Sequence, residues 1–168
     1  MFEPDAWNLS EQERNLSSLA RDIGQNKIAD RAAEYDRNAA FPIDNYRDMY
    51  DAGLMGICIP QEYGGHGVDL RGYALVAAEI GRYCGSTALT WNMHVCSCLW
   101  SGALTDDLDM DEADRQRHRV NRAIHYRRIL DEGAIYSQPF SEGGAAAAGA
   151  AAFSTTALKV QGGWRVNG

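Results

Sequence analysis

Apolar residues recur every three to four positions, the spacing of a helix, through the N-terminal part of the chain. Ser10 and Glu13 form an S-x-x-E capping box, in which each side chain satisfies a backbone N–H group of the first turn. The pattern predicts one helix that begins at Ser10 and ends near Asn38, shortly before Pro42. Its apolar positions are Leu16, Leu19, Ile23, Ile28, Ala32 and Tyr35.

A second helix and an apolar connection follow. Pro42 suits the first turn of a helix over residues 43–52, and Gly53 supplies its stop. Residues 54–60 then predict a short extended apolar connection. Residues 61–67, which read QEYGGHG, predict a tight loop and match neither a dinucleotide-binding motif nor a P-loop.

Two apolar helices complete this region. Asp69 opens the third helix, and we expect Gly85 to end it. Its apolar side is formed by Tyr73, Val76, Ala77, Ile80 and Tyr83. The fourth helix, residues 87–104, has no clear polar face, so we expect it to be central.

Charged residues dominate the next segment. An acidic run begins at Asp106, and six arginines follow between Arg115 and Arg128. The favoured interpretation is one exposed helix over residues 111–132, because acids at its start and bases toward its end suit the helix dipole. A basic patch for a phosphate-bearing ligand stays open as the alternative.

The pattern changes from helix to strand after Gly133. Short strands are predicted at residues 134–138, 153–160 and 164–166, with a hairpin turn before the last. Residues 143–152 are nearly all Ala and Gly and predict a loop. The fold class is therefore mainly α, a helical domain over residues 1–133 followed by the first strands of an incomplete β domain, residues 134–168. Since two or three strands cannot bury a face alone, we expect the chain to be cut short.

Composition narrows the function classes. The 168 residues carry a net charge of -7, which argues against a general nucleic-acid binder. No run of about 20 apolar residues predicts a membrane span, and the acidic first residues do not resemble a secretory signal peptide. The four cysteines are Cys58, Cys84, Cys96 and Cys98. Their spacing favours reduced, mostly buried thiols in a cytoplasmic protein, and no cluster has the spacing of metal ligands.

Five short segments occur together in a diagnostic order. They are LMGICIPQEYGGHG at 54–67, EIGR at 79–82 with STA at 86–88, IYSQP at 135–139, TTA at 155–157 and GWRVNG at 163–168. In this order they resemble the acyl-CoA dehydrogenase family of flavoproteins, with its PEEYGGxG segment and its Thr-Glu-Pro strand end. The resemblance covers residues 10–168. It implies the family's helical-bundle N-terminal domain and the opening of its middle β domain.

The resemblance also implies an activity. In that family FAD removes two hydrogens from an acyl-CoA thioester, giving the α,β-enoyl form, and electrons pass to an electron-transfer flavoprotein or similar acceptor. The full-length enzyme is expected to be a homo-oligomer. The catalytic carboxylate is expected beyond Gly168, so no catalytic base is named in this chain.

Four residues are implied as cofactor contacts. Ser137 matches the Thr of the Thr-Glu-Pro motif, where a hydroxyl donates to the isoalloxazine edge, and Tyr136 stands where a main-chain contact is expected. Gly143 stands where the family has a pyrophosphate-contacting Ser. The backbone N–H groups of Gly143 and Gly144 form either an anion-binding nest or a plain flexible turn.

Two residues are candidates on the substrate side. His94 lies on the apolar fourth helix, where it is either a core histidine or part of the wall of the substrate cavity. Ser141 is a candidate to supply, from a nearby position, the hydroxyl that is missing where Gly143 replaces the family's Ser. Gln138 stands where the family has Glu, and the loop after it departs from the family pattern. A flavin-dependent monooxygenase of the same fold therefore stays open, as does a non-catalytic helical interaction module.

Overall fold

The computed structural model describes residues 8–138 and 153–168. These residues fall into two compact units, one that ends at Ser137 and one that begins at Gln138. The first unit is helical, and the second contains a two-stranded hairpin. The mainly α fold class with a short β segment is confirmed. Among the described residues, none of the helices has the length and apolar character needed to cross a membrane.

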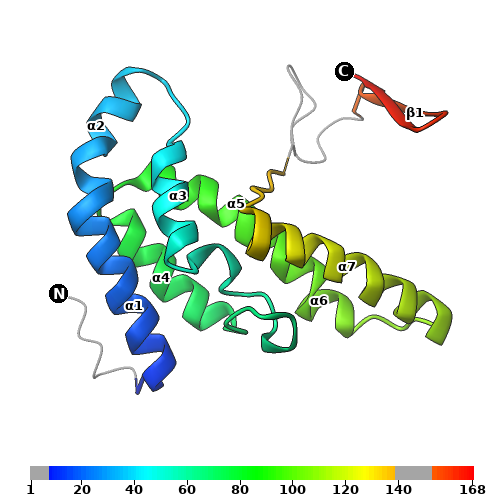
Figure 1. Ribbon diagram of the computed structural model, residues 1–168, viewed down its shortest axis with the longest axis horizontal. Coiled ribbons are helices and arrows are strands. Elements are labelled where there is room, and N and C mark those ends of the chain that lie inside the picture. The colour runs from blue at the N-terminus through cyan, green and yellow to red at the C-terminus, as the bar shows by residue number, and fades with distance from the viewer. Residues whose placement is uncertain (1–7, 139–152) are drawn as a thin grey trace. The chain divides into compact units, whose positions relative to one another are not determined.

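The first predicted helix is present but is not uniform. It consists of α1 (Glu11–Ile23), a π-helical turn (Gly24–Ile28) and α2 (Ala29–Arg37) (Figure 1). The capping box at Ser10 is confirmed, with both of its side-chain hydrogen bonds formed. The π-helical turn lies where a Cβ on Gly24 would come within 2.2 Å of the Tyr83 ring. A glycine at this position allows the aromatic ring to pack directly against the helix backbone.

The second helix and the loop after it pack into the core. α3 spans Ile43–Asp51, as the sequence predicts. The prediction of an extended connection after it is wrong, because the chain forms 3₁₀ turns at Leu54–Gly56 (η3) and Gln61–Tyr63 (η4). The turns place the side chains of Leu54, Ile57 and Ile59 in full burial, which a strand with alternating faces would not do.

The two apolar helices are shifted from their predicted ends. α4 spans Leu70–Gly81, and α5 spans Gly85–Ser101, followed by the short α6 (Ala103–Asp106). Gly85 therefore begins α5 rather than ending α4, which corrects the prediction. The reason is that the Cys84 sulfur accepts a hydrogen bond from the Thr87 backbone N–H and so caps α5.

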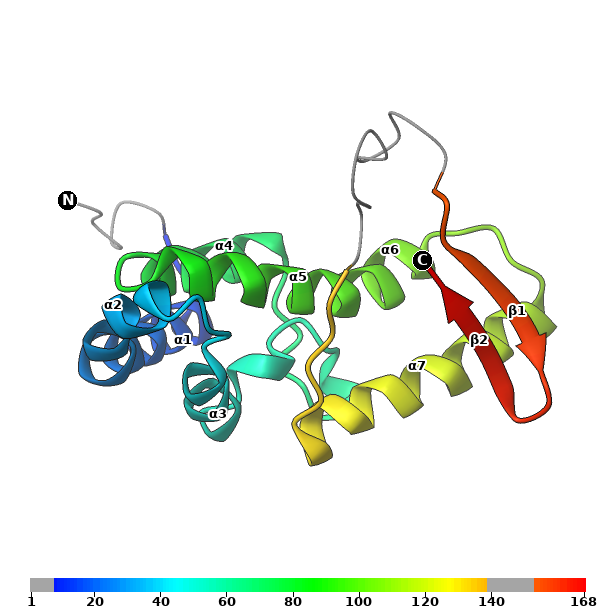
Figure 2. The same ribbon diagram turned by 90° about the horizontal axis from the view of Figure 1, so that it is seen from above.

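α5 is central to the first unit. Trp91, His94 and Val95 are fully buried along it. α4 packs against α1 on one side and α5 on the other. The segment that contains η3 and η4 contacts both α5 and α7 (Glu112–Glu132), and Figure 2 shows it between these two helices.

α7 confirms the predicted charged helix, with Asp111 as its N-cap. Most of its surface is exposed, but Arg122, Tyr126 and Ile129 are buried along one stripe. Gly133 ends the helix with a φ of 66°, a left-handed conformation that favours glycine, and so turns the chain back toward α5.

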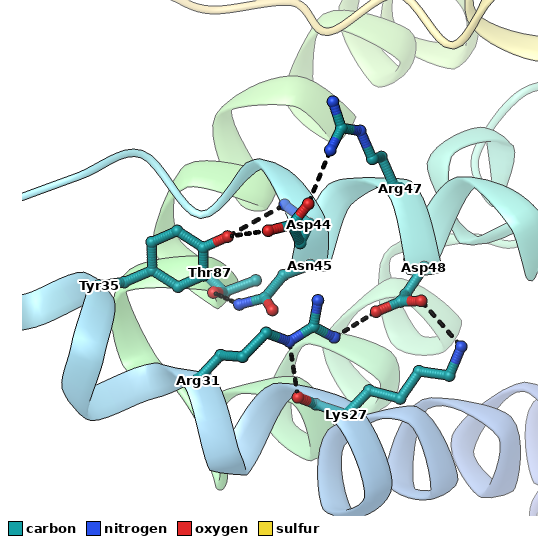
Figure 3. A network of polar contacts seen from close by, with 8 residues as sticks. All are labelled: Lys27, Arg31, Tyr35, Asp44, Asn45, Arg47, Asp48 and Thr87. Atoms are coloured by element: carbon teal, nitrogen blue, oxygen red, sulfur yellow. Dashed lines mark hydrogen bonds and ion pairs between the residues drawn. The ribbon is translucent and has the colours of Figure 1, made fainter.

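A polar network joins α2, α3 and the start of α5 (Figure 3). Asp48 on α3 pairs with Lys27 at 2.8 Å and with Arg31. The Tyr35 hydroxyl donates to Asp44, and the buried Asn45 amide donates to the Thr87 hydroxyl at 2.9 Å. These contacts hold α3 against α2 and the start of α5, with its apolar residues facing the core.

The second unit contains the predicted hairpin. β1 (Thr156–Val160) pairs antiparallel with β2 (Gly163–Asn167), in a register that places Ala157 opposite Val166. All residues of both strands are exposed. The strand predicted at residues 134–138 is not formed. Backbone N–H groups of that segment donate to Arg128 and His94, so they do not enter a strand ladder.

Candidate functional site

The segment after α7 is attached to α5 through His94. The ring Nδ1 atom of this histidine lies 3.1 Å from the backbone nitrogen of Tyr136, and its Nε2 atom lies 3.0 Å from the Met55 carbonyl oxygen. Because the Tyr136 N–H group is a donor, Nδ1 accepts, and the neutral ring carries its hydrogen on Nε2. Nε2 therefore donates to Met55. Figure 2 shows the segment crossing from the end of α7 toward α5.

Burial sets the charge of this histidine. His94 has no exposed surface. Burial lowers its pKa below the ordinary value of 6.5, and the hydrogen bond with Met55 only partly opposes this effect. The imidazole is consequently neutral near pH 7, which is the form that accepts a hydrogen bond from Tyr136.

The side chain of Tyr136 is attached to the other helix. Its hydroxyl lies 2.6 Å from Nδ1 of His125 on α7. The two rings meet edge to face, with centroids 5.6 Å apart and planes at 85°. The centroid of the His94 ring lies 6.3 Å from that of Tyr136. Tyr136 is therefore bound through its backbone on one side and through its side chain on the other.

The anchored segment ends at Ser137, which is exposed. The structure thus brings together two residues that the sequence singled out, His94 and Tyr136, and presents Ser137 next to them. Gly143, Gly144 and Ser141 lie outside the described residues. The role of His94 as a substrate contact stays a prediction. In the structure both of its ring nitrogens bind main-chain groups of Met55 and Tyr136.

His125 was missed by sequence reasoning. It lies on a helix judged to be exposed, and its partner is 11 residues away in the sequence. Helical periodicity reports which side chains face the core, and His125 faces the returning chain instead. The only feature that the sequence offered was a histidine on this helix, about two turns before its last residue.

A buried arginine fixes the helix that carries His125. The Arg122 guanidinium donates to the Tyr63 hydroxyl at 3.1 Å and to the Asp106 carboxylate at 2.5 Å. It also lies 5.2 Å from the centre of the Tyr63 ring. One turn later, the buried Tyr126 hydroxyl donates to the Cys98 carbonyl oxygen of α5. α7 is thereby connected to η4, α6 and α5.

A separate cavity of about 850 Å³ lies beside the second half of α5. Its wall includes Cys58, Val68, Leu70, Cys96 and Trp100, so it is largely apolar. Burial raises the pKa of Cys58 to about 12, and all four cysteines are free thiols. Among the described residues, no group of His, Cys, Asp and Glu side chains has metal-binding geometry. The cavity is therefore suited to contact with apolar groups, and the Cys58 thiol in its wall is protonated near neutral pH.

Comparison with known proteins settles the family. Residues 10–104, more than half of the chain, match the family model described as "Acyl-CoA dehydrogenase, N-terminal domain". The chain belongs to the acyl-CoA dehydrogenase family. The matched region runs from the capping box of α1 into α6, so it includes all of α5, the central helix of the unit.

Individual relatives include a dehydrogenase and a protein solved with FMN and a nucleotide-linked sugar. The chain is 43% identical over 82 residues to a cyclohex-1-ene-1-carbonyl-CoA dehydrogenase of Syntrophus aciditrophicus. The aligned residues are 48% of this chain and 20% of that protein. KijD3, solved in complex with FMN and dTDP-3-amino-2,3,6-trideoxy-4-keto-3-methyl-D-glucose, is similar with a TM-score of 0.64 and 29% identity. That match covers 76% of this chain and 30% of KijD3.

The fold is also that of a solved dehydrogenase. Butyryl-CoA dehydrogenase from Megasphaera elsdenii matches with a TM-score of 0.71 and 21% identity, over 96% of this chain and 40% of that chain. The chain spans about a fifth to a quarter of the length of the curated relatives it matches, with shares of 22%, 20% and 24% for three of them.

Proposed function

We propose that this chain supplies the helical N-terminal domain and the first flavin contacts of an FAD-dependent enzyme. The reaction is the α,β-dehydrogenation of an acyl-CoA thioester. The observation that supports the proposal is the anchored segment 134–137, which ends in the exposed Ser137 at the position of the family's Thr-Glu-Pro motif. In this proposal residues 1–133 form the N-terminal domain, and residues 134–168 open the middle β domain.

The donor chemistry of the segment fits a flavin. An isoalloxazine edge presents nitrogen and oxygen acceptors, and the Ser137 hydroxyl and backbone N–H are donors. The N–H of Tyr136 already donates to His94, so Tyr136 would face the ring with its remaining main-chain and side-chain atoms. FAD, when bound, supplies the hydride acceptor. The chain's own contribution is to hold donors at fixed positions beside that acceptor.

The remaining assignments follow from the family. We propose Tyr136, Ser137, Gly143 and Gly144 as the cofactor contacts of this chain, with Ser141 and His94 on the substrate side. The substrate is an acyl-CoA, as the names of the dehydrogenase relatives support. An electron-transfer flavoprotein or similar protein takes up the electrons, and the enzyme works as a homo-oligomer in the cytoplasm.

The test uses the protein as its source cells make it. The protein is purified from those cells with an affinity tag placed before Met1, and any bound flavin is released and identified by chromatography. The preparation is then assayed with a series of acyl-CoA thioesters and an artificial electron-accepting dye. FAD together with thioester-dependent reduction of the dye is the expected result. A colourless protein that gains no flavin on titration would overturn the proposal.

A second candidate function is favoured by one observation. KijD3 shares 29% identity with this chain over 76% of it, and that protein was solved with FMN and a nucleotide-linked sugar. Gln138 and the segment after it also depart from the family's Thr-Glu-Pro pattern. The alternative is a flavin-dependent monooxygenase that uses reduced flavin and oxygen. Release of FMN, oxygen consumption with supplied reduced flavin and no acyl-CoA oxidation would select it.

A further inference from the structure

The proposed flavin contacts leave one feature around Tyr136 unused. His125 does not lie in the anchored segment, yet its Nδ1 atom is 2.6 Å from the Tyr136 hydroxyl. The edge-to-face arrangement of the two rings, at 85°, adds a second point of contact. The histidine is itself exposed, so burial in a core does not explain its place.

The two histidines hold Tyr136 in complementary ways. His94 on α5 accepts from its backbone N–H, and His125 on α7 binds its hydroxyl at the far end of the side chain. A single hydrogen bond leaves a residue able to rotate about that contact. Two contacts at opposite ends fix both the position and the rotation of residue 136. The Cα atom from which the chain continues to Ser137 is then fixed as well.

α7 is a rigid support for such a contact. Arg122, three residues before His125, is buried and binds Tyr63 and Asp106. Tyr126, the next residue, is 1% exposed and donates to the Cys98 carbonyl. Groups that position a functional residue need supports of this kind, because a loosely held support transmits its own motion to the site.

We propose that His125 is a positioning residue of the flavin site. It does not contact the flavin; with His94 it fixes Tyr136, and through Tyr136 it sets the direction in which Ser137 presents its hydroxyl and N–H. This inference rests on the proposed function, since it assigns Ser137 to a flavin. It adds a residue that neither the family motifs nor the sequence pattern indicated.

The first experiment needs no flavin and uses the full chain. Amide hydrogen exchange of Tyr136 is compared in the wild type, His125→Leu, His125→Gln and His118→Leu. Loss of one hydrogen bond predicts about five-fold faster exchange in His125→Leu, because the segment opens more often. His125→Gln keeps an amide that can bind the hydroxyl, so its exchange is expected to stay near the wild-type rate.

His118 provides the matched control. It is a histidine of the same helix, and its Nε2 lies 2.9 Å from the Ser101 carbonyl oxygen, away from the anchored segment. His118→Leu also removes one ring and one hydrogen bond, and it is expected to leave Tyr136 exchange unchanged. Equal exchange in the wild type and His125→Leu overturns the proposal. Equal acceleration in both leucine variants shows a general loss of stability and overturns it too.

The second experiment connects the contact to the flavin. FAD is titrated into the same four proteins, prepared with the N-terminal tag from the source cells and freed of bound flavin. His125→Leu is expected to bind FAD about five-fold more weakly, with His125→Gln and His118→Leu near the wild type. Unchanged affinity in His125→Leu overturns the positioning role. If the wild type binds no FAD, the proposed function fails, while the exchange experiment still decides whether His125 fixes Tyr136.

Discussion

The Nδ1 atom of His94 accepts a hydrogen bond from the backbone of Tyr136, 42 residues later in the chain, at 3.1 Å. The contact joins the centre of α5 to the segment that follows α7. It requires a neutral imidazole, because a protonated Nδ1 is a donor and cannot accept. The fold of the helical unit and the placement of Ser137 are therefore connected to the protonation of one buried ring.

The first prediction concerns this ring and pH. Because the pKa of His94 lies below 6.5, the folded state binds fewer protons there than the unfolded state. Its contribution to stability is complete above pH 6.5 and is lost as the pH falls below that value. His94→Gln removes the titration, so the difference in unfolding free energy between wild type and variant should shrink toward acid pH. Urea unfolding on both sides of pH 6.5 measures it, and a constant difference contradicts the prediction.

The second prediction concerns the ion pair between α1 and α4. Glu13 accepts from Arg71 at 2.6 Å, and hydrogen bonds from Arg71 and Ser10 lower its pKa from 4.5 to about 2. The stability that the carboxylate contributes is present above pH 4.5 and lost as the pH falls to about 2. Glu13→Gln should therefore lower the melting temperature at neutral pH and approach the wild type near pH 2. Glu11→Gln, in the same helical turn, is the control, and an equal effect in both variants would argue against the pairing.

Local rules were enough to predict three helix starts, those of α1, α4 and α7. The sequence predicts helices that start at Ser10, Asp69 and Asp111, and each of these side chains accepts a backbone N–H of the first turn. Such contacts involve only residues three positions apart, so they can be read from the sequence alone. The turn at Gly162 of the hairpin was predicted for the same reason.

Tertiary contacts explain what could not be predicted. The connection at Leu54 was predicted to be extended because it is short and apolar, but its burial between α5 and α7 favours 3₁₀ turns. The close packing of the Tyr83 ring on Gly24 in the π-helical turn joins two residues that are distant in the sequence. The contact between His125 and Tyr136 arises only because Gly133 reverses the chain. Periodicity in one segment contains no information about any of these partners.

The third prediction tests the reason for Gly24. A Cβ there would lie 2.2 Å from the Tyr83 ring, so Gly24→Ala should destabilise the protein by about 2 kcal/mol, despite the higher helix propensity of alanine. Gly85→Ala is the control, because Gly85 is also helical and its added Cβ would meet no atom within 4 Å. Urea unfolding measures both variants. Adding Tyr83→Ala to Gly24→Ala should recover part of the loss, and an additive loss would contradict this explanation.

The fourth prediction concerns how α7 is held. Arg122 is 5% exposed and binds Asp106, whose side chain is 49% exposed. Arg122→Met should cost about 2 kcal/mol of unfolding free energy, less than for a fully buried pair because Asp106 can recover water contacts. Arg119→Met, an exposed arginine of the same helix, should have little effect. Asp106→Asn should destabilise the wild type, because it leaves the buried Arg122 cation with only the more distant Glu62 carboxylate, at 3.8 Å, as a charge partner. The same substitution should have little effect when it is added to Arg122→Met. A double-mutant cycle from urea unfolding measures this coupling, and independent effects would show that the pair does not hold the helix.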